Sequence, residues 1–97
     1  MRLDVFLKIS RLIARRSLAR EFCDAGLVSV NNLQAKSSKG VKANDEIEIR
    51  RRNRLTKISV LEIPDRKQLS KAGAGDLYKI ISDEIPEDQN ALILKSP

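Results

Sequence analysis

Residues 1–25 carry apolar side chains at the spacing of an α-helix. The apolar positions recur every three or four residues, as on one helical face: Leu3, Phe6, Leu7, Ile9 and Ile13. At about 100° per residue, four charged positions share the opposite face: Asp4, Lys8, Arg11 and Arg15. We expect this helix to break between Ser10 and Arg16. A second helix then runs to about Ala25, and Gly26 follows at the position where helices often turn left-handed.

From residue 28 the apolar period shortens to two, which is typical of strands buried on one side. Val28 and Val30 alternate with polar neighbours. The Asn31-Asn32 pair that follows predicts a hairpin turn, because Asn tolerates positive φ better than other non-glycine residues. Further strands are expected around Leu33–Ala35, around Ile47–Ile49, and over Leu55–Leu61 as one strand or two short pieces.

The chain changes character after Pro64, where a polar stretch with two glycines begins. Asp76 is placed to cap a short helix that carries the apolar residues Leu77, Ile80 and Ile81. The remaining C-terminal end is expected to be mobile. These patterns predict an α+β protein with one domain over residues 1–63 and a polar extension over residues 64–97.

Size and composition limit what the chain can do. A protein of 97 residues buries roughly 65% of its unfolded surface, which suffices for one modest core. Its single cysteine, Cys23, lies on the apolar stripe of the second helix and is expected to be buried and inert. One cysteine also favours a reducing, cytoplasmic setting. Because the sequence has no histidine, the commonest general base and metal ligand, we expect no enzyme, no metal and no other cofactor.

The cations are distributed unevenly along the chain. Residues 1–60 hold 14 basic and 6 acidic side chains, whereas residues 61–97 hold 5 basic and 7 acidic ones. The net charge of +6 is therefore concentrated in the first part of the chain. Such an imbalance favours a polyanionic partner, either nucleic acid or an acidic membrane surface.

Three interpretations of the N-terminal cations stay open. They could form a solvated helix face, but such faces usually alternate signs, and here only Asp4 and Glu21 offset the basic group. They could belong to a cleaved transit peptide, although its removal would uncover the first strands. They could instead bind a polyanion. A second run of arginines over residues 50–54, argued from charge alone, is an exposed turn or an additional phosphate contact.

The order of short motifs along the first half of the chain resembles the S4 RNA-binding domain. The motifs are, in order, Arg2-Leu3-Asp4, Phe6-Leu7, Arg11-Leu12, Arg16 to Ala19, Gly26, Val28 to Asn31, Lys36, Val41-Lys42 and Asp45 to Ile47. The resemblance implies an S4-like fold of the alpha-L type, in which two packed helices precede a small, bent, mostly antiparallel sheet. Asn32 and Asn44 stand where the family usually has glycine, and Asn is the best substitute at positive φ.

The chain is also similar to stand-alone members of this family, the RqcP-type ribosome-associated quality-control factor and a small heat-shock-induced ribosome-binding protein. This similarity implies a monomer that binds large-subunit rRNA and tRNA on a large ribosomal subunit with a stalled nascent chain. It further implies that the protein stabilises P-site tRNA while a partner protein adds a tail to that chain. The competing interpretation is a basic amphipathic module that binds membrane surfaces or acidic proteins.

Carried over to matching positions, the resemblance implies these RNA contacts: Arg2, Lys8, Arg11, Arg15, Arg16, Lys36 and Lys42. Asp4 is expected to orient neighbouring arginines or to accept a hydrogen bond from RNA, and it could pair with Lys8 one turn on. The interpretation requires the N-terminal guanidinium groups to face outward rather than to turn inward as partners of buried carboxylates. Replacing Arg16 with Ala should then weaken RNA binding and leave thermal stability close to normal.

Overall fold

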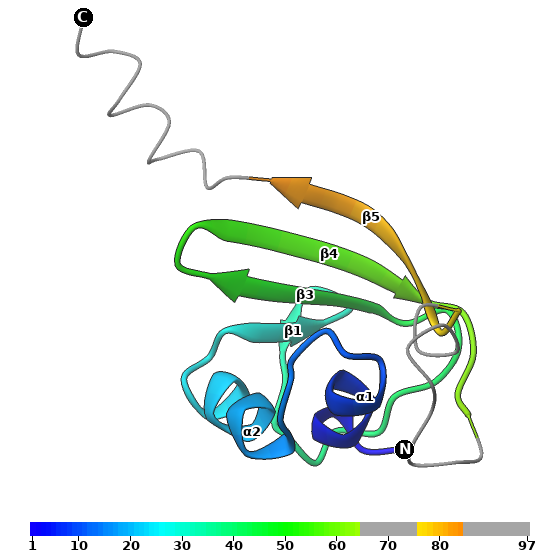
Figure 1. Ribbon diagram of the computed structural model, residues 1–97, viewed down its shortest axis with the longest axis horizontal. Coiled ribbons are helices and arrows are strands. Elements are labelled where there is room, and N and C mark those ends of the chain that lie inside the picture. The colour runs from blue at the N-terminus through cyan, green and yellow to red at the C-terminus, as the bar shows by residue number, and fades with distance from the viewer. Residues whose placement is uncertain (65–75, 85–97) are drawn as a thin grey trace, which may run out of the picture.

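The computed structural model describes residues 1–64 and 76–84, and the chain begins with two short helices. Helix α1 spans Leu3–Ile9 and helix α2 spans Arg16–Asp24. The predicted break between them is confirmed, and both helices lie on one face of the sheet (Figure 1). Within the described ranges, no helix is long and apolar enough to cross a membrane.

Helix α1 ends within the charged stripe that the sequence suggested, after Lys8 and before Arg11. Ser10 caps it, and Arg11 then adopts a left-handed conformation with φ 63°. Lys8 lies in the last turn of α1, whereas Arg15 is the N-cap residue of α2. The prediction that these cations share one helical face is therefore wrong, because the chain leaves the helix between them.

Five strands form one antiparallel sheet in the order β2-β1-β3-β4-β5. Their bounds are β1 Val28–Val30, β2 Leu33–Gln34, β3 Glu46–Arg51, β4 Arg54–Val60 and β5 Tyr78–Glu84. Asn31 and Asn32 join β1 to β2 with φ values of 53° and 69°, as the two-residue hairpin requires. Gly26 and Asn44 also have positive φ, at 77° and 75°. The turn predictions at these four positions are confirmed.

Strand β5 stands where the sequence pattern predicted a short C-terminal helix, so that prediction is wrong. Leu77, Ile80 and Ile81 have helical spacing, but tyrosine and isoleucine fit a pleated surface better than a short isolated helix. Strand β4 offers an edge on which β5 pairs along its whole length, with a bulge between Lys57 and Ile58. The predicted polar stretch and mobile end lie outside the described residues.

The core lies between the helix pair and the sheet. Its largest fully buried apolar side chains come from α1 and from three strands: Leu3, Phe6, Leu7, Val28, Ile47, Ile49, Ile58 and Val60. Ala19 of α2 is fully buried beside them. Burying one such side chain contributes about 1.5–3 kcal/mol. This packing fixes the helix pair on the sheet, and the apolar residues of the N-terminal segment are part of it.

Cys23 is buried on α2, as predicted. Desolvation, with smaller contributions from the charges of Asp4 and Asp24, raises the pKa of its thiol from 9.0 to about 11. The thiol is therefore neutral at physiological pH, and because the thiolate is the reactive form, this cysteine is chemically quiet.

Candidate RNA-binding site

Asp4 is a fully buried carboxylate in the first turn of α1. The expectation that it lies on the solvated face is wrong. Its neighbour three residues on is Leu7, a core residue, so Asp4 lies at the border of the apolar face of α1, where Arg16 at the start of α2 contacts it. Asp4 forms ion pairs with Arg2 and Arg16, whereas the sequence suggested Lys8 as its partner.

Two arginines from different elements meet this carboxylate. The Nε and Nη2 atoms of Arg2 donate to the two carboxylate oxygens of Asp4 at 3.2 and 3.3 Å. The Nε atom of Arg16 donates to the Oδ2 atom of Asp4 at 3.2 Å. Since Arg2 precedes α1 and Arg16 begins α2, one buried anion ties the starts of both helices together.

The charge state of Asp4 follows from two opposing effects. Burial disfavours the carboxylate and by itself raises the pKa of Asp4, but hydrogen bonds from Arg2 and Arg16, together with their positive charges, lower it. The arginines prevail, and the pKa of Asp4 lies below its ordinary 3.8. The carboxylate is therefore ionised at neutral pH and makes charge-assisted hydrogen bonds, the stronger class.

Arg2 and Arg16 are partners of a buried carboxylate, yet they are not turned inward. Their side chains remain 47% and 50% exposed. A guanidinium group has five N–H donors, and Asp4 takes two from Arg2 and one from Arg16. Donors remain for a second anion, so the orienting role expected for Asp4 agrees with this geometry.

The loop of residues 36–41 is fastened to the N-terminal segment by backbone hydrogen bonds. Three backbone amides form hydrogen bonds between the loop and the N-terminal segment. Leu3 donates to the Lys39 carbonyl at 2.8 Å, Asp4 to the Ser37 carbonyl at 3.1 Å, and Val41 to the Met1 carbonyl at 2.8 Å. Arg2 and Gly40 form an isolated antiparallel bridge at the same place. The loop and the arginine cluster are therefore one rigid surface.

This loop carries exposed lysines. Lys36, predicted from the sequence, is exposed, and so is Lys39, which the sequence reading missed. The available signal was the repeat of lysines at positions 36, 39 and 42 in a segment that has no Asp or Glu from residue 25 to residue 44. Lys42 is also exposed, and its amide donates to the buried carboxylate of Asp45 at 3.0 Å, which holds the loop before β3.

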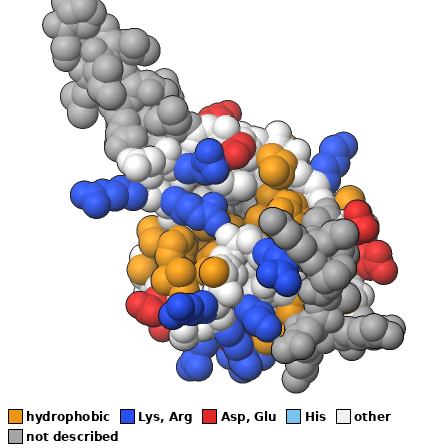
Figure 2. All heavy atoms as spheres, viewed as in Figure 1, with side chains coloured by type: hydrophobic (Ala, Val, Ile, Leu, Met, Phe, Trp, Pro, Cys, Tyr) orange, Lys and Arg blue, Asp and Glu red, His pale blue; other side chains and the backbone are white. Residues whose placement is uncertain are grey.

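The other predicted contacts of the N-terminal segment lie around the helix pair. Lys8 is half-buried, and Arg11 and Arg15 are exposed in the connection between α1 and α2. Figure 2 shows lysine and arginine side chains over the helix pair and near the β3–β4 hairpin, with hydrophobic side chains between them. A polyanion lying on this face would meet several cations from separate elements.

The arginines of residues 50–54 form the β3–β4 hairpin, and one of them has an inward role. The Nη2 atom of Arg51 donates to the backbone carbonyl of Leu12, and its Nη1 atom donates to the hydroxyl of Thr56 at 3.4 Å. Arg51 therefore ties the hairpin to the α1–α2 connection. No sequence signal distinguished it from its neighbours, because the contact joins residues 39 positions apart.

Strand β5 completes this second network. Its Asp83 accepts a hydrogen bond from Thr56 at 3.1 Å and forms an ion pair with Arg54 at 3.3 Å. Arg50 and Arg52 are exposed. Within this run, Arg51 and Arg54 therefore link parts of the structure, whereas Arg50 and Arg52 present their charges to solvent.

The sequence of this chain is similar to those of known proteins. Residues 1–47 match the S4 domain. The RQC P-site tRNA stabilizing factor of Streptococcus pneumoniae is 46% identical over 88 residues, which cover 91% of this chain and 98% of that protein. The factor of the same name from Bacillus subtilis is 45% identical over 84 residues, covering 87% of this chain and 95% of that protein.

Two solved structures share the fold. Trimeric heat shock protein 15 of Vibrio cholerae has a TM-score of 0.76 and 28% identity, and the match covers 96% of this chain and 94% of that one. The solution structure of hypothetical protein HP1423 has a TM-score of 0.75 and 33% identity, covering 87% and 100%. Because the sequence identity extends over nearly the full length of its relatives, this chain belongs to the RQC P-site tRNA stabilizing factor family and carries an S4 domain.

Proposed function

We propose that this protein binds the RNA of a large ribosomal subunit together with its P-site tRNA and stabilises that tRNA after a nascent chain has stalled. The name of its relatives supplies the identity of the RNA. The observation that carries the proposal is the pair of half-exposed guanidinium groups fixed on the buried carboxylate of Asp4. The action is positional and requires no covalent step.

The arginine cluster supports this function because its geometry exists before RNA arrives. Ordering a flexible side chain at an interface costs about 0.5–1.5 kcal/mol. Arg2 and Arg16 are already ordered by Asp4, so part of that cost is met during folding. Their remaining donors suit the bidentate recognition of phosphate. In the proposal, the surrounding cations attract and hold further phosphates: Lys8, Arg11, Arg15, Lys36 and Lys42.

The partners follow from the same proposal. One surface contacts large-subunit rRNA and peptidyl-tRNA, and a separate protein adds the tail to the stalled chain. This places the protein on cytoplasmic ribosomes, where it works as a monomer. Its structural neighbour from Vibrio cholerae is described as trimeric, so the mass of this protein in solution, measured by light scattering, tests the monomer directly.

Co-sedimentation tests the central claim. Purified large subunits with and without P-site tRNA are mixed with the full-length protein, and anionic vesicles serve as the competing partner. We expect retention on tRNA-bearing subunits and loss of retention in the Arg2→Ala and Arg16→Ala variants, whereas Lys79→Ala, an exposed residue on β5, behaves as wild type. Retention on vesicles alone would instead support the membrane-surface interpretation.

The salt dependence of binding tests the phosphate contacts. If about five to eight phosphates are engaged, the logarithm of the affinity falls with the logarithm of salt concentration at a slope of about −4 to −7. The measurement is a titration of fluorescent protein with large subunits at several potassium concentrations. A nearly salt-independent affinity would contradict the proposal.

A further inference from the structure

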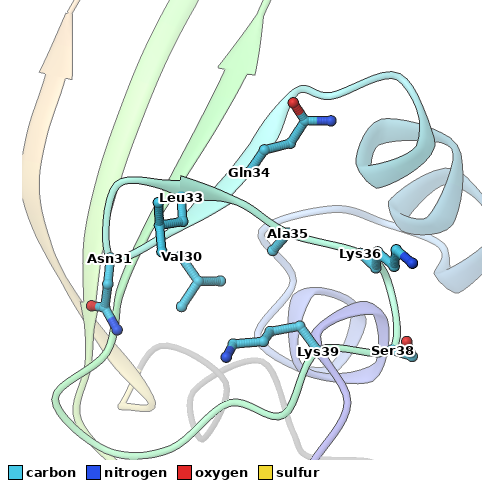
Figure 3. A pocket seen from close by; sticks show the side chains of 8 residues that line it. All are labelled: Val30, Asn31, Leu33, Gln34, Ala35, Lys36, Ser38 and Lys39. Atoms are coloured by element: carbon cyan, nitrogen blue, oxygen red, sulfur yellow. The ribbon is translucent and has the colours of Figure 1, made fainter.

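A cavity of about 340 Å³ opens beside the β1–β2 hairpin, apart from the arginine cluster. Figure 3 shows the hairpin on one side, the following loop on the other, and the Lys39 side chain extending across the opening. Val30 and Ala35 supply buried apolar surface, whereas Leu33 is an apolar wall that is 72% exposed. Its volume and apolar lining are those of a small-ligand site.

Cations border this apolar surface. Lys36 and Lys39 both line the cavity and are exposed. The acidic residue that follows them, Asp45, is 5% exposed, and the Nδ2 atom of Asn31 and the amide of Lys42 donate to its carboxylate. The site is therefore an apolar hollow with two exposed lysines on its rim, and Asp24 lines the adjoining hollow beside Lys36. A fitting ligand has a compact, largely apolar group joined to an anion.

The loop that borders the cavity is joined to the arginine cluster by backbone hydrogen bonds. The amides of Leu3 and Asp4 donate to the carbonyls of Lys39 and Ser37, so the loop that borders the cavity is held against the segment that carries Arg2. An RNA strand with a phosphate on Arg2 would therefore continue along a rigid, basic loop. This continuity favours RNA over an unrelated lipid or acidic peptide as the occupant.

We propose that this cavity receives one unstacked nucleobase of the bound RNA, with the adjoining phosphates on Lys36 and Lys39. The inference rests on the proposed RNA-binding function and adds to it a site for unpaired RNA. Leu33 and Val30 would cover a face of the base, as apolar side chains do in pockets that hold a base taken out of its stack. The amide of Gln34 and the hydroxyl of Ser38 lie at the same cavity and can meet a base edge.

Amide NMR titration of the full chain tests the pocket with defined probes. The probes are the four ribonucleoside 5′-monophosphates and ribose 5-phosphate, which has the same phosphate and sugar but no base. We expect the nucleotides to shift the signals of Leu33 and Ala35, and ribose 5-phosphate to shift only those of Lys36 and Lys39. Equal shifts by both kinds of probe, or no shift at Leu33 and Ala35, would overturn the inference.

A paired set of RNA hairpins tests it in context. One hairpin is fully paired in its stem, and the other carries a single bulged 2-aminopurine, whose fluorescence reports its stacking. The wild-type protein should bind the bulged RNA about fivefold more tightly, with a fluorescence change. Leu33→Ala, at a position that is 72% exposed, should reduce that preference to less than about twofold. The matched control is Leu61→Ala, at a side chain that is 51% exposed and away from the cavity.

The outcomes separate the pocket from the function on which it depends. Equal binding of both hairpins by the wild-type protein would refute the pocket and leave RNA binding intact. Binding of neither hairpin, with no retention on large subunits, would refute both. An effect of Leu33→Ala confined to anionic vesicles would assign the cavity to lipid and overturn the inference.

Discussion

This protein has two groups of arginines, one at the helix starts and one at the β3–β4 hairpin, and their side chains are held by different partners. At the helix starts, Arg2 and Arg16 share the fully buried Asp4 and remain about half exposed. At the β3–β4 hairpin, Arg51 donates to an internal carbonyl, and Arg54 pairs with an acid on β5 that is itself 34% exposed. A buried anchor shared by two outward-facing guanidinium groups organises a surface. The hairpin contacts mainly hold strands and loops together.

The comparison shows that the number of arginines in a group does not tell how their side chains are held. What distinguishes the helix starts is that the anion is removed from water while the cations are not. Because the Asp4 carboxylate is buried, water and dissolved ions cannot replace the arginines as its partners. It therefore holds both guanidinium groups at defined positions. This difference can be tested by replacing in turn the buried carboxylate, one arginine of each group, and Arg51.

Removing the anchor should have the largest effect. Asp4→Ala leaves Arg2 and Arg16 without their anion. Because these arginines are half exposed, we expect a loss of about 1–3 kcal/mol in the free energy of unfolding rather than the full cost of breaking a buried pair. Affinity for tRNA-bearing large subunits should fall by more than about tenfold. Urea unfolding and co-sedimentation measure the two quantities, and Asp24→Ala, an exposed acid on α2, is the matched control.

Removing one cation from each group should separate them by binding. Arg16→Ala should weaken subunit binding about tenfold, whereas Arg52→Ala, at the exposed hairpin turn, should change it by less than about twofold. The buried contact of Arg16 also revises the stability expected from sequence alone. Asp4 keeps both hydrogen bonds from Arg2 in that variant, so unfolding should be easier by about 1 kcal/mol. Equal binding by the two variants would show that the two arginine groups do not differ in their contribution to subunit binding.

Removing Arg51, which links the β3–β4 hairpin to the α1–α2 connection, should affect stability more than binding. Arg51→Ala leaves the Leu12 carbonyl without this donor, and we expect a loss of about 1–2 kcal/mol in the free energy of unfolding. Subunit affinity should fall by only about two- to threefold, through the displaced α1–α2 connection. Arg50→Ala, an exposed neighbour on the same strand, is the control. A loss of binding without a loss of stability would reassign Arg51 to the RNA surface.

The effect that is smallest near neutral pH is a pH dependence of stability, which appears only at acid and alkaline pH. Since the pKa of Asp4 is lowered on folding, its contribution is present above 3.8, the ordinary value, and is lost as the pH falls through the folded pKa. Burial of Cys23 raises its pKa from 9.0 to about 11, so its contribution is lost as the pH rises through that window. Urea unfolding across pH should show a shallower acid limb for Asp4→Asn and a shallower alkaline limb for Cys23→Ala than for wild type.

Local features of the fold were predictable because single residue types determine them. Asn31, Asn32 and Asn44 all adopt the positive φ that their place in the pattern requires, and Gly26 ends the second helix as expected. The apolar spacing also predicted both helices and most strands. These elements depend on backbone preferences and periodicity, which are properties of short segments.

The features that sequence reasoning missed depend on contacts across long separations. Strand β5 forms because it pairs with the edge of β4, and the local sequence of residues 78–84 does not indicate that pairing. Asp4 is buried because Arg16, twelve residues on, makes the burial tolerable. A carboxylate three residues before a core leucine, with arginines nearby, was the available signal for this cluster. Arg51 offered no such signal.

The left-handed backbone at Arg11 has a consequence for anyone who engineers this protein. A non-glycine residue at φ 63° costs about 1 kcal/mol or more relative to glycine. Glycine at this position would relieve that strain, but it would also remove the cation and the interaction that the arginine side chain makes. A thermostable variant obtained in that way should be checked for activity before it is preferred over the parent.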